Sequence, residues 1–96
     1  MLFVLTAIDK PDGAPIRAAT RAAHLDFVNA GGRVKLGGPF LAPDGGMIGS
    51  LLIFEAENLE AAQAWAASDP YAKAGLFAQS AVRPWKATLN VCGAAL

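Results

Sequence analysis

The stretch LFVLTAI, residues 2–8, is apolar at every position except Thr6. The segment that follows it, DKPDGAP (residues 9–15), contains the Pro, Asp and Gly residues that mark a loop. A short, dense apolar run bounded by turn residues predicts a buried strand. The segment MIGSLLIFEA, residues 47–56, has the same character. In each run, both the odd-numbered and the even-numbered residues are mostly apolar. Successive residues of a strand point to opposite faces of the sheet, so both strands are expected to present two apolar faces.

The rest of the chain fits around these two strands. The alanine-rich segment 15–30 predicts a helix, with Pro15 suited to its first turn and Gly31 and Gly32 ending it. Segment 33–41, RVKLGGPFL, places Val34 and Leu36 opposite Arg33 and Lys35, which is typical of a short edge strand with a bend at its glycines. A turn at 42–46, a second helix capped by Asn58 and running to about Ser68, and a final strand at 76–85 complete the series.

The order β-α-β-β-α-β predicts a ferredoxin-like α+β fold with a four-stranded antiparallel sheet. We expect one domain over residues 1–88 and a C-terminal tail over 89–96. Two helices cover only one face of such a sheet, so its other face is normally polar. Here that face is apolar, and a second copy of the chain is the simplest cover for it. The sequence therefore predicts a homodimer that packs through its sheet faces.

Composition excludes several classes of protein. The chain has 96 residues, of which 54% are hydrophobic and 17% charged, with a formal net charge of zero. Its basic residues are scattered and lack aromatic neighbours, which argues against nucleic-acid binding. Its apolar start is too short to span a membrane and lacks a basic leader, so we expect no membrane partner. A single cysteine, Cys92, fits a reducing compartment and predicts a cytoplasmic protein.

Few residues carry chemistry, and each has a structural explanation. The only histidine, His24, falls at the border between the polar and apolar faces of the first helix, where an inert, half-buried ring is the simpler interpretation. Asp69 stands before Pro70, which suits both a helix N-cap and a catalytic carboxylate. Ser50 lies in mid-strand, and Tyr71 either packs or lines a pocket. One His and one Cys form no metal-binding pattern, so we expect neither metal nor cofactor.

Five short motifs connect these residues to a known family. They are R..HL at Arg21, His24 and Leu25, GGPF at 37–40, GS at 49–50, LEAAQAWA at 59–66 and DPYAKAG at 69–75. In this order and spacing, the chain resembles the YCII-related (YciI-like) family of small dimeric α+β-barrel proteins. The resemblance runs from the first residue to about Trp85.

The resemblance implies a pocket near the sheet and a His–Asp acid/base pair, which falls on His24 and Asp69. With histidine as acid or base, the implied function is a cofactor-independent lyase or isomerase acting on a small cyclic or carbonyl compound. One branch of the family is similar to enzymes that eliminate chloride from a chlorinated hydroxyhydroquinone. We expect the small-molecule substrate to contact the following residues: Arg21, Gly38, Pro39, Ser50 and Tyr71. A non-catalytic module for small-ligand binding or assembly is the alternative.

Overall fold

The computed structural model describes residues 1–96 and confirms the predicted order of elements. The elements are β1 (Leu2–Asp9), α1 (Ala14–Asn29), β2 (Val34–Leu41), β3 (Met47–Glu55), α2 (Leu59–Ala67), α3 (Pro70–Lys73) and β4 (Phe77–Pro84). A 3-10 turn, Ala30–Gly32, follows α1, and α3 is a single helical turn inserted before the last strand. The four strands form one antiparallel sheet in the order β2-β3-β1-β4. The fold is therefore ferredoxin-like, with the two apolar strands β1 and β3 at its centre.

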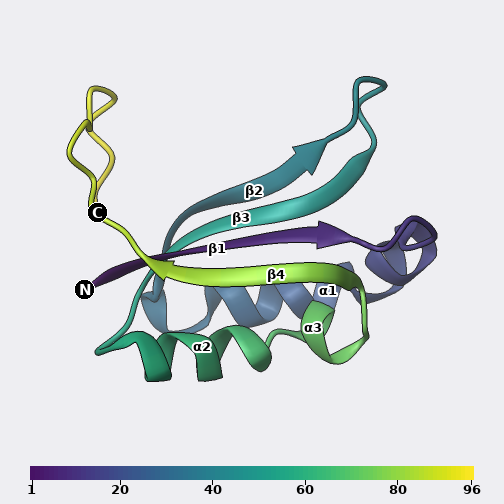
Figure 1. Cartoon of the computed structure of the whole chain (residues 1–96), viewed down its shortest axis with the longest axis horizontal. Helices are drawn as coiled ribbons and strands as arrows, with labels where there is room; N and C mark the ends of the chain where they lie inside the picture. The colour runs from purple at the N-terminus through teal and green to yellow at the C-terminus, as the bar shows by residue number, and fades with distance from the viewer.

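The three helices lie against one face of the sheet, and its other face carries no helix (Figure 1). The core between the layers is built on directly paired residues of β1 and β3, Phe3 with Phe54 and Leu5 with Leu52. The small side chains Ala62 and Ala66, one turn apart on α2, pack against this cluster. Alanine at both positions lets the helix approach the large residues of the central strands closely.

The central strands β1 and β3 are largely apolar on the uncovered face of the sheet, as their sequence pattern predicts, whereas the edge strand β4 places Gln79 and Arg83 on that face beside Ile8 and Val4. Phe3, Leu5 and Ala7 are buried beneath the helices, so the alternate residues of β1 point to the other face. There, Val4 pairs with Ile53, and Ile8 remains 39% exposed. No helix of the chain has the length and apolar character needed to cross a membrane.

Strand β2 departs from its predicted alternation. Val34 pairs with Phe54, but Leu36 pairs with Ile53, so one extra residue, Lys35, is inserted between these pairs. Such a bulge shifts the pleat by one position. The prediction that Val34 and Leu36 share one face was therefore wrong: Val34 lies on the helix side, and Leu36 lies on the uncovered face, where it is 55% exposed.

The predicted caps and stops are present. The Asn58 side chain accepts a hydrogen bond from the backbone N–H of Ala61, 2.8 Å away, at the start of α2. Gly31 and Gly32 have φ values of 75° and 65°, which end α1 in a conformation that suits glycine. No helix or strand follows Pro84, and Cys92 is exposed in that last segment. All helices and strands therefore lie within residues 2–84.

Candidate functional site

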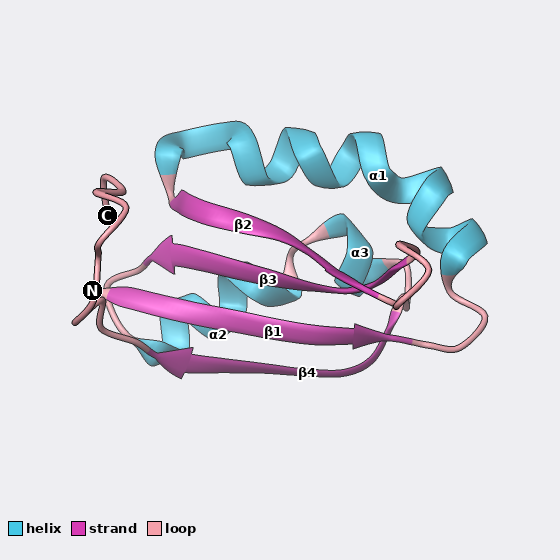
Figure 2. Cartoon of the chain, turned by 90° about the horizontal axis from the view of Figure 1, so that it is seen from above, coloured by secondary structure: helices cyan, strands magenta, loops and turns pink.

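A cavity of about 400 Å³ lies between α1 and the edge of the sheet formed by β2 and β3. Seen from above, α1 runs alongside the β2 edge of the sheet (Figure 2), and residues of both elements line the cavity. The bordering part of β2 is Gly37, Gly38 and Pro39, which carry little side chain to fill that space. The volume lies within the range of small-molecule sites.

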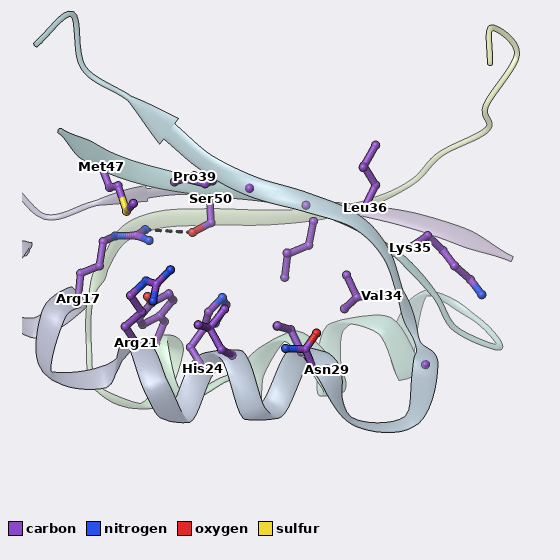
Figure 3. Close-up of a pocket in the computed structure, with 17 residues that line it drawn as sticks. Arg17, Arg21, His24, Asn29, Val34, Lys35, Leu36, Pro39, Met47 and Ser50 are labelled. Carbon is purple, nitrogen blue, oxygen red and sulfur yellow. Dashed lines mark hydrogen bonds between the residues drawn. The ribbon is translucent and has the colours of Figure 1, made fainter. Parts of the chain in front are cut away.

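One face of α1 supplies the polar wall of the cavity. Arg17, Arg21 and His24 follow each other at intervals of four and three residues, so they stand on the same side of the helix. In Figure 3 all three side chains rise from α1 toward the sheet, with Ser50 opposite them on β3. The helix thereby presents its only histidine to the cavity.

His24 is held by the buried carboxylate of Asp69. Its Nδ1 lies 2.9 Å from Asp69 Oδ1 and 3.0 Å from Oδ2. Asp69 is 1% exposed, and the Tyr71 ring stacks on the imidazole with centroids 3.9 Å apart and planes 16° from parallel. Because α3 brings these two side chains onto the ring, His24 is 8% exposed and lies deeper than its border position on α1 suggests.

Asp69 also caps α3. Its Oδ1 accepts a hydrogen bond from the backbone N–H of Tyr71 at 2.9 Å, and Pro70 occupies the first turn. The sequence allows Asp69 to be both a helix cap and a partner of His24, and both contacts are present. The cap fixes the carboxylate, and the carboxylate in turn fixes the imidazole.

This contact determines which nitrogen of His24 is available. An ionised carboxylate only accepts hydrogen bonds, so Nδ1 carries the proton and donates it to Asp69. No group of the protein is hydrogen-bonded to Nε2, and no enclosed polar side-chain atom in the protein lacks a partner. Nε2 is therefore the unprotonated nitrogen of the neutral ring and is open to the cavity.

A second buried ion pair borders the cavity and was not predicted. Arg17 Nε donates to Asp9 Oδ2 at 2.8 Å, and Nη2 donates to Asp9 Oδ1 at 3.0 Å. The same Nη2 is also 3.0 Å from Ser50 Oγ and from the Gly49 carbonyl oxygen. Burial opposes the charge of Arg17, but the hydrogen bond and charge of Asp9 outweigh it, so the pKa of Arg17 is raised. Nothing in the sequence pattern distinguishes Arg17 from an ordinary basic residue of a solvated helix.

Tyr71 connects the two ion pairs. Its ring stacks on His24 on the α1 side, and the Arg17 guanidinium lies 4.8 Å from its centroid, within cation–π range. Burial raises the pKa of the Tyr71 hydroxyl, although the positive charges of Arg17 and Arg21 partly offset this. The hydroxyl is therefore neutral at physiological pH.

The structure brings the predicted site residues together around one cavity. Its lining includes His24 and all five residues expected to contact a substrate, namely Arg21, Gly38, Pro39, Ser50 and Tyr71. Asp69 stands behind the imidazole instead of lining the cavity. The geometry thus shows a shared location, while the roles of these residues in binding or reaction stay predictions.

Comparisons with known proteins give the same family for most of the chain. Residues 1–86 match the YCII-related domain. Protein YciI of Escherichia coli O6:H1 is 42% identical over 95 residues, covering 90% of this chain and 97% of that protein. An uncharacterised protein of Haemophilus influenzae is 39% identical over the same shares of both chains.

Solved structures show similar proteins of the same fold. The 5-chloro-2-hydroxyhydroquinone dehydrochlorinase TftG of Burkholderia phenoliruptrix AC1100, in complex with 2,5-dihydroxybenzoquinone, is 37% identical with a TM-score of 0.81. That comparison covers 90% of this chain and 94% of TftG. An antibiotic biosynthesis monooxygenase has a TM-score of 0.55 at 15% identity, covering 93% of this chain and 100% of that one. The second likeness shows the fold alone.

Proposed function

This chain belongs to the YCII-related family, and on that basis we propose that it is a small-molecule enzyme in which His24 moves a proton and Asp69 orients it. The reaction is a lyase or isomerase reaction on a small cyclic or carbonyl compound. The observation that carries this proposal is the 2.9 Å contact between His24 Nδ1 and Asp69 Oδ1 beside a cavity of about 400 Å³.

The His24–Asp69 contact suits general acid–base catalysis. Asp69 keeps the proton on Nδ1, so Nε2 is free to accept a proton from an O–H or C–H group in the cavity. The imidazolium formed in this way is stabilised by the adjacent carboxylate, which has no other cation within hydrogen-bonding distance. The stacked Tyr71 ring holds the imidazole plane in place during the transfer.

In both a lyase and an isomerase reaction, the protons and electron pairs balance without a further reactant. In an elimination, Nε2 takes a proton from the substrate, and the bond to the leaving group breaks with its electron pair remaining on that group. In an isomerisation, the same proton returns to another atom of the substrate. In both cases His24 ends in its starting state after it has exchanged one proton with substrate or solvent.

The likeness to TftG supports the elimination reaction. That protein is named as a dehydrochlorinase, and it shares 37% of its residues with this chain over 90% of the chain's length. We extend the reaction class from it, an acid/base elimination on a hydroxylated ring, and take the substrate in its name as the compound for the first assay. A cavity of this size accommodates a single six-membered ring with its substituents.

A non-catalytic binding module is the alternative. It draws on the apolar part of the lining, which includes Leu25, Val28 and Leu52 and suits a small ligand without requiring any reaction. The open space beside His24 argues against a purely assembly-related role, in which side chains would fill it. Binding and catalysis are separated by turnover.

We also propose that the chain works as a homodimer through the uncovered face of its sheet. Val4, Leu51 and Ile53 form the centre of that face, with Ile8 and Leu36 still exposed on it. Burying apolar surface contributes roughly 25 cal/mol per Å². A second copy applied to the same face would bury these side chains in a closed, symmetric interface.

The direct test is chloride release from 5-chloro-2-hydroxyhydroquinone by the wild-type protein and by His24→Ala. We expect turnover by the wild-type protein and a loss of roughly 10²–10⁴-fold in the variant, the usual contribution of a positioned acid or base. Lys86→Gln, at an exposed position beyond β4, is the control and should leave the rate unchanged. Stoichiometric binding of this compound and related phenols without turnover would contradict the enzyme and support the binding module.

A further inference from the structure

The hydroxyl of Ser50 has a donor hydrogen without an acceptor. Its oxygen accepts a hydrogen bond from Arg17 Nη2 at 3.0 Å, and no group of the protein accepts a hydrogen bond from the hydroxyl itself. Ser50 is 4% exposed and points from β3 into the cavity, facing α1 (Figure 3). Because a buried hydroxyl without an acceptor is unfavourable, the hydroxyl proton is available to an acceptor placed in the cavity.

Arg17 fixes the direction of that donor. Its guanidinium is itself held at Nε and Nη2 by the carboxylate of Asp9, so it has little freedom to move. Nη2 occupies an acceptor position on Ser50 Oγ and thereby limits where the hydroxyl proton can point. Asp9, Arg17 and Ser50 form a chain of hydrogen bonds that ends in a donor facing the cavity.

Two cations that line the cavity, Arg21 and Lys35, form no ion pair. None of the 17 lining residues is Asp or Glu. Asp9 neutralises Arg17, and Asp69 faces His24 from behind. Lys35 lies far from Ser50 along the lining, whereas Arg21 stands between Arg17 and His24 on the side where Ser50 faces α1 (Figure 3). The region around Arg21 and Ser50 is therefore positive and rich in hydrogen-bond donors.

We propose that the cavity takes its ligand as an oxyanion, a phenolate or enolate whose oxygen accepts the Ser50 hydrogen bond and faces the Arg21 guanidinium. Arg17 is the positioning residue for Ser50. This inference rests on the proposed function, because it names the class of substrate on which the His24 reaction acts. An oxyanion beside His24 is also what remains when Nε2 removes a proton from a hydroxyl or from a carbon next to a carbonyl, and oriented donors stabilise that charge.

The test is equilibrium binding of 4-nitrophenol, which fits a one-ring cavity and whose phenolate absorbs visible light while the neutral phenol does not. The titration is performed below the pH at which the free phenol ionises. We expect the wild-type protein to bind the probe and raise the phenolate absorbance, because the site favours the charged form. Failure to bind at millimolar concentration, or binding as the neutral phenol, would overturn the proposal.

Three variants assign the effect to residues. Ser50→Ala and Arg21→Gln should each weaken phenolate binding by roughly 10- to 100-fold, since hydrogen bonds to charged groups contribute about 1.5–3 kcal/mol. Arg17→Lys keeps the positive charge but loses the fork that joins Asp9 to Ser50, so it should also reduce the phenolate fraction of the bound probe. Lys86→Gln removes an equal charge at an exposed position outside the cavity and should bind as the wild type does.

The binding measurements involve no turnover. Together with the chloride-release assay, they therefore separate the oxyanion site from the proposed enzyme activity. Phenolate binding that depends on Ser50 and Arg21 in a protein that turns over no phenol would support the oxyanion site and contradict the enzyme. Chloride release that is lost in His24→Ala but unchanged in Ser50→Ala and Arg21→Gln would support the enzyme and contradict the oxyanion site.

Discussion

His24 and Asp69 are 45 residues apart in the chain, and their side chains meet at 2.9 Å in the interior of the protein. Two local features produce this contact. The spacing of α1 places His24 on the face toward the sheet, and the cap of α3 holds the Asp69 carboxylate still while it accepts from both Tyr71 N–H and the imidazole. A helix cap therefore also orients the imidazole that faces the cavity.

Replacement of Asp69 by Asn should separate the two tasks of this residue. Asparagine caps helices about as well as aspartate, so the melting temperature should change little. The Asn amide lets Nδ1 act as an acceptor, which moves the ring proton to Nε2, and activity should fall by roughly 10²–10⁴-fold. Asn58→Ala is the matched control: it removes the cap of α2, costs about 1 kcal/mol of stability and should leave the rate intact. Equal activity in Asp69→Asn and wild type would leave Asp69 with a structural role only.

Two glycines near the cavity should respond in opposite ways to alanine. A Cβ at Gly49 would collide with the Ala7 carbonyl oxygen and lie 2.9 Å from Phe40 Cδ2, whereas one at Gly38 would meet nothing within 4 Å. We expect Gly49→Ala to lower the free energy of unfolding by roughly 1–3 kcal/mol and Gly38→Ala to leave it unchanged or raise it slightly. Chemical denaturation measures both. A Gly49→Ala protein as stable as the wild type would refute the close packing of β3 against β1 and β2.

Two equally exposed apolar residues provide a test variant and a control for the predicted dimer. Ile8, on the uncovered sheet face, and Leu59, at the start of α2, are each 39% exposed. Sedimentation of the wild type at micromolar concentration should give two chains per particle. Ile8→Glu should shift this toward one chain because it buries an unpaired carboxylate in the proposed interface, while Leu59→Glu should not. A monomeric wild-type protein, or dissociation by Leu59→Glu alone, would contradict the proposed interface.

The buried Tyr71 hydroxyl predicts a loss of stability in alkali. Its pKa is raised by burial in the folded protein, so the folded state holds this proton more tightly than the unfolded state does. This difference in proton binding contributes to the free energy of unfolding. The contribution is complete below the pKa of the tyrosine in the unfolded chain, about 10, and is lost as the pH rises through the raised pKa of Tyr71 in the folded protein. Across that window, the stability of the wild type should fall more steeply than that of Tyr71→Phe. Parallel pH profiles for the two proteins would show that the hydroxyl is solvated.

The fold was largely predictable because its determinants are local. The apolar runs at 2–8 and 47–56 identify the two central strands, and Asn58 and Gly31 mark helix ends by capping chemistry that operates within a few residues. The bulge at Lys35 was not predictable, since an extra residue in a strand leaves no mark in an alternating pattern until the partner strand is known. It reversed the side of Leu36 for that reason.

The site was predictable only in part. His24 stands out as the only histidine, and Asp69 as an acid before a proline, so both carry a signal in one sequence. Arg17 and Asp9 carry none: their pairing depends on how α1 returns across the end of β1, and a helix with several Arg and Ala residues looks solvated from its sequence. The depth of His24 was also underestimated, because the burial comes from α3 and not from its own helix.

The central claim is that Asp69 keeps the proton of neutral His24 on Nδ1 and leaves Nε2 free toward the cavity. Because His24 is the only histidine, a long-range ¹H–¹⁵N NMR spectrum of the protein contains a single imidazole, which reports its tautomer directly. We predict the Nδ1–H tautomer in the wild type above the pH at which the ring loses its charge, and its loss in Asp69→Asn. A neutral ring protonated at Nε2, or a tautomer mixture that Asp69→Asn leaves unchanged, would contradict the account.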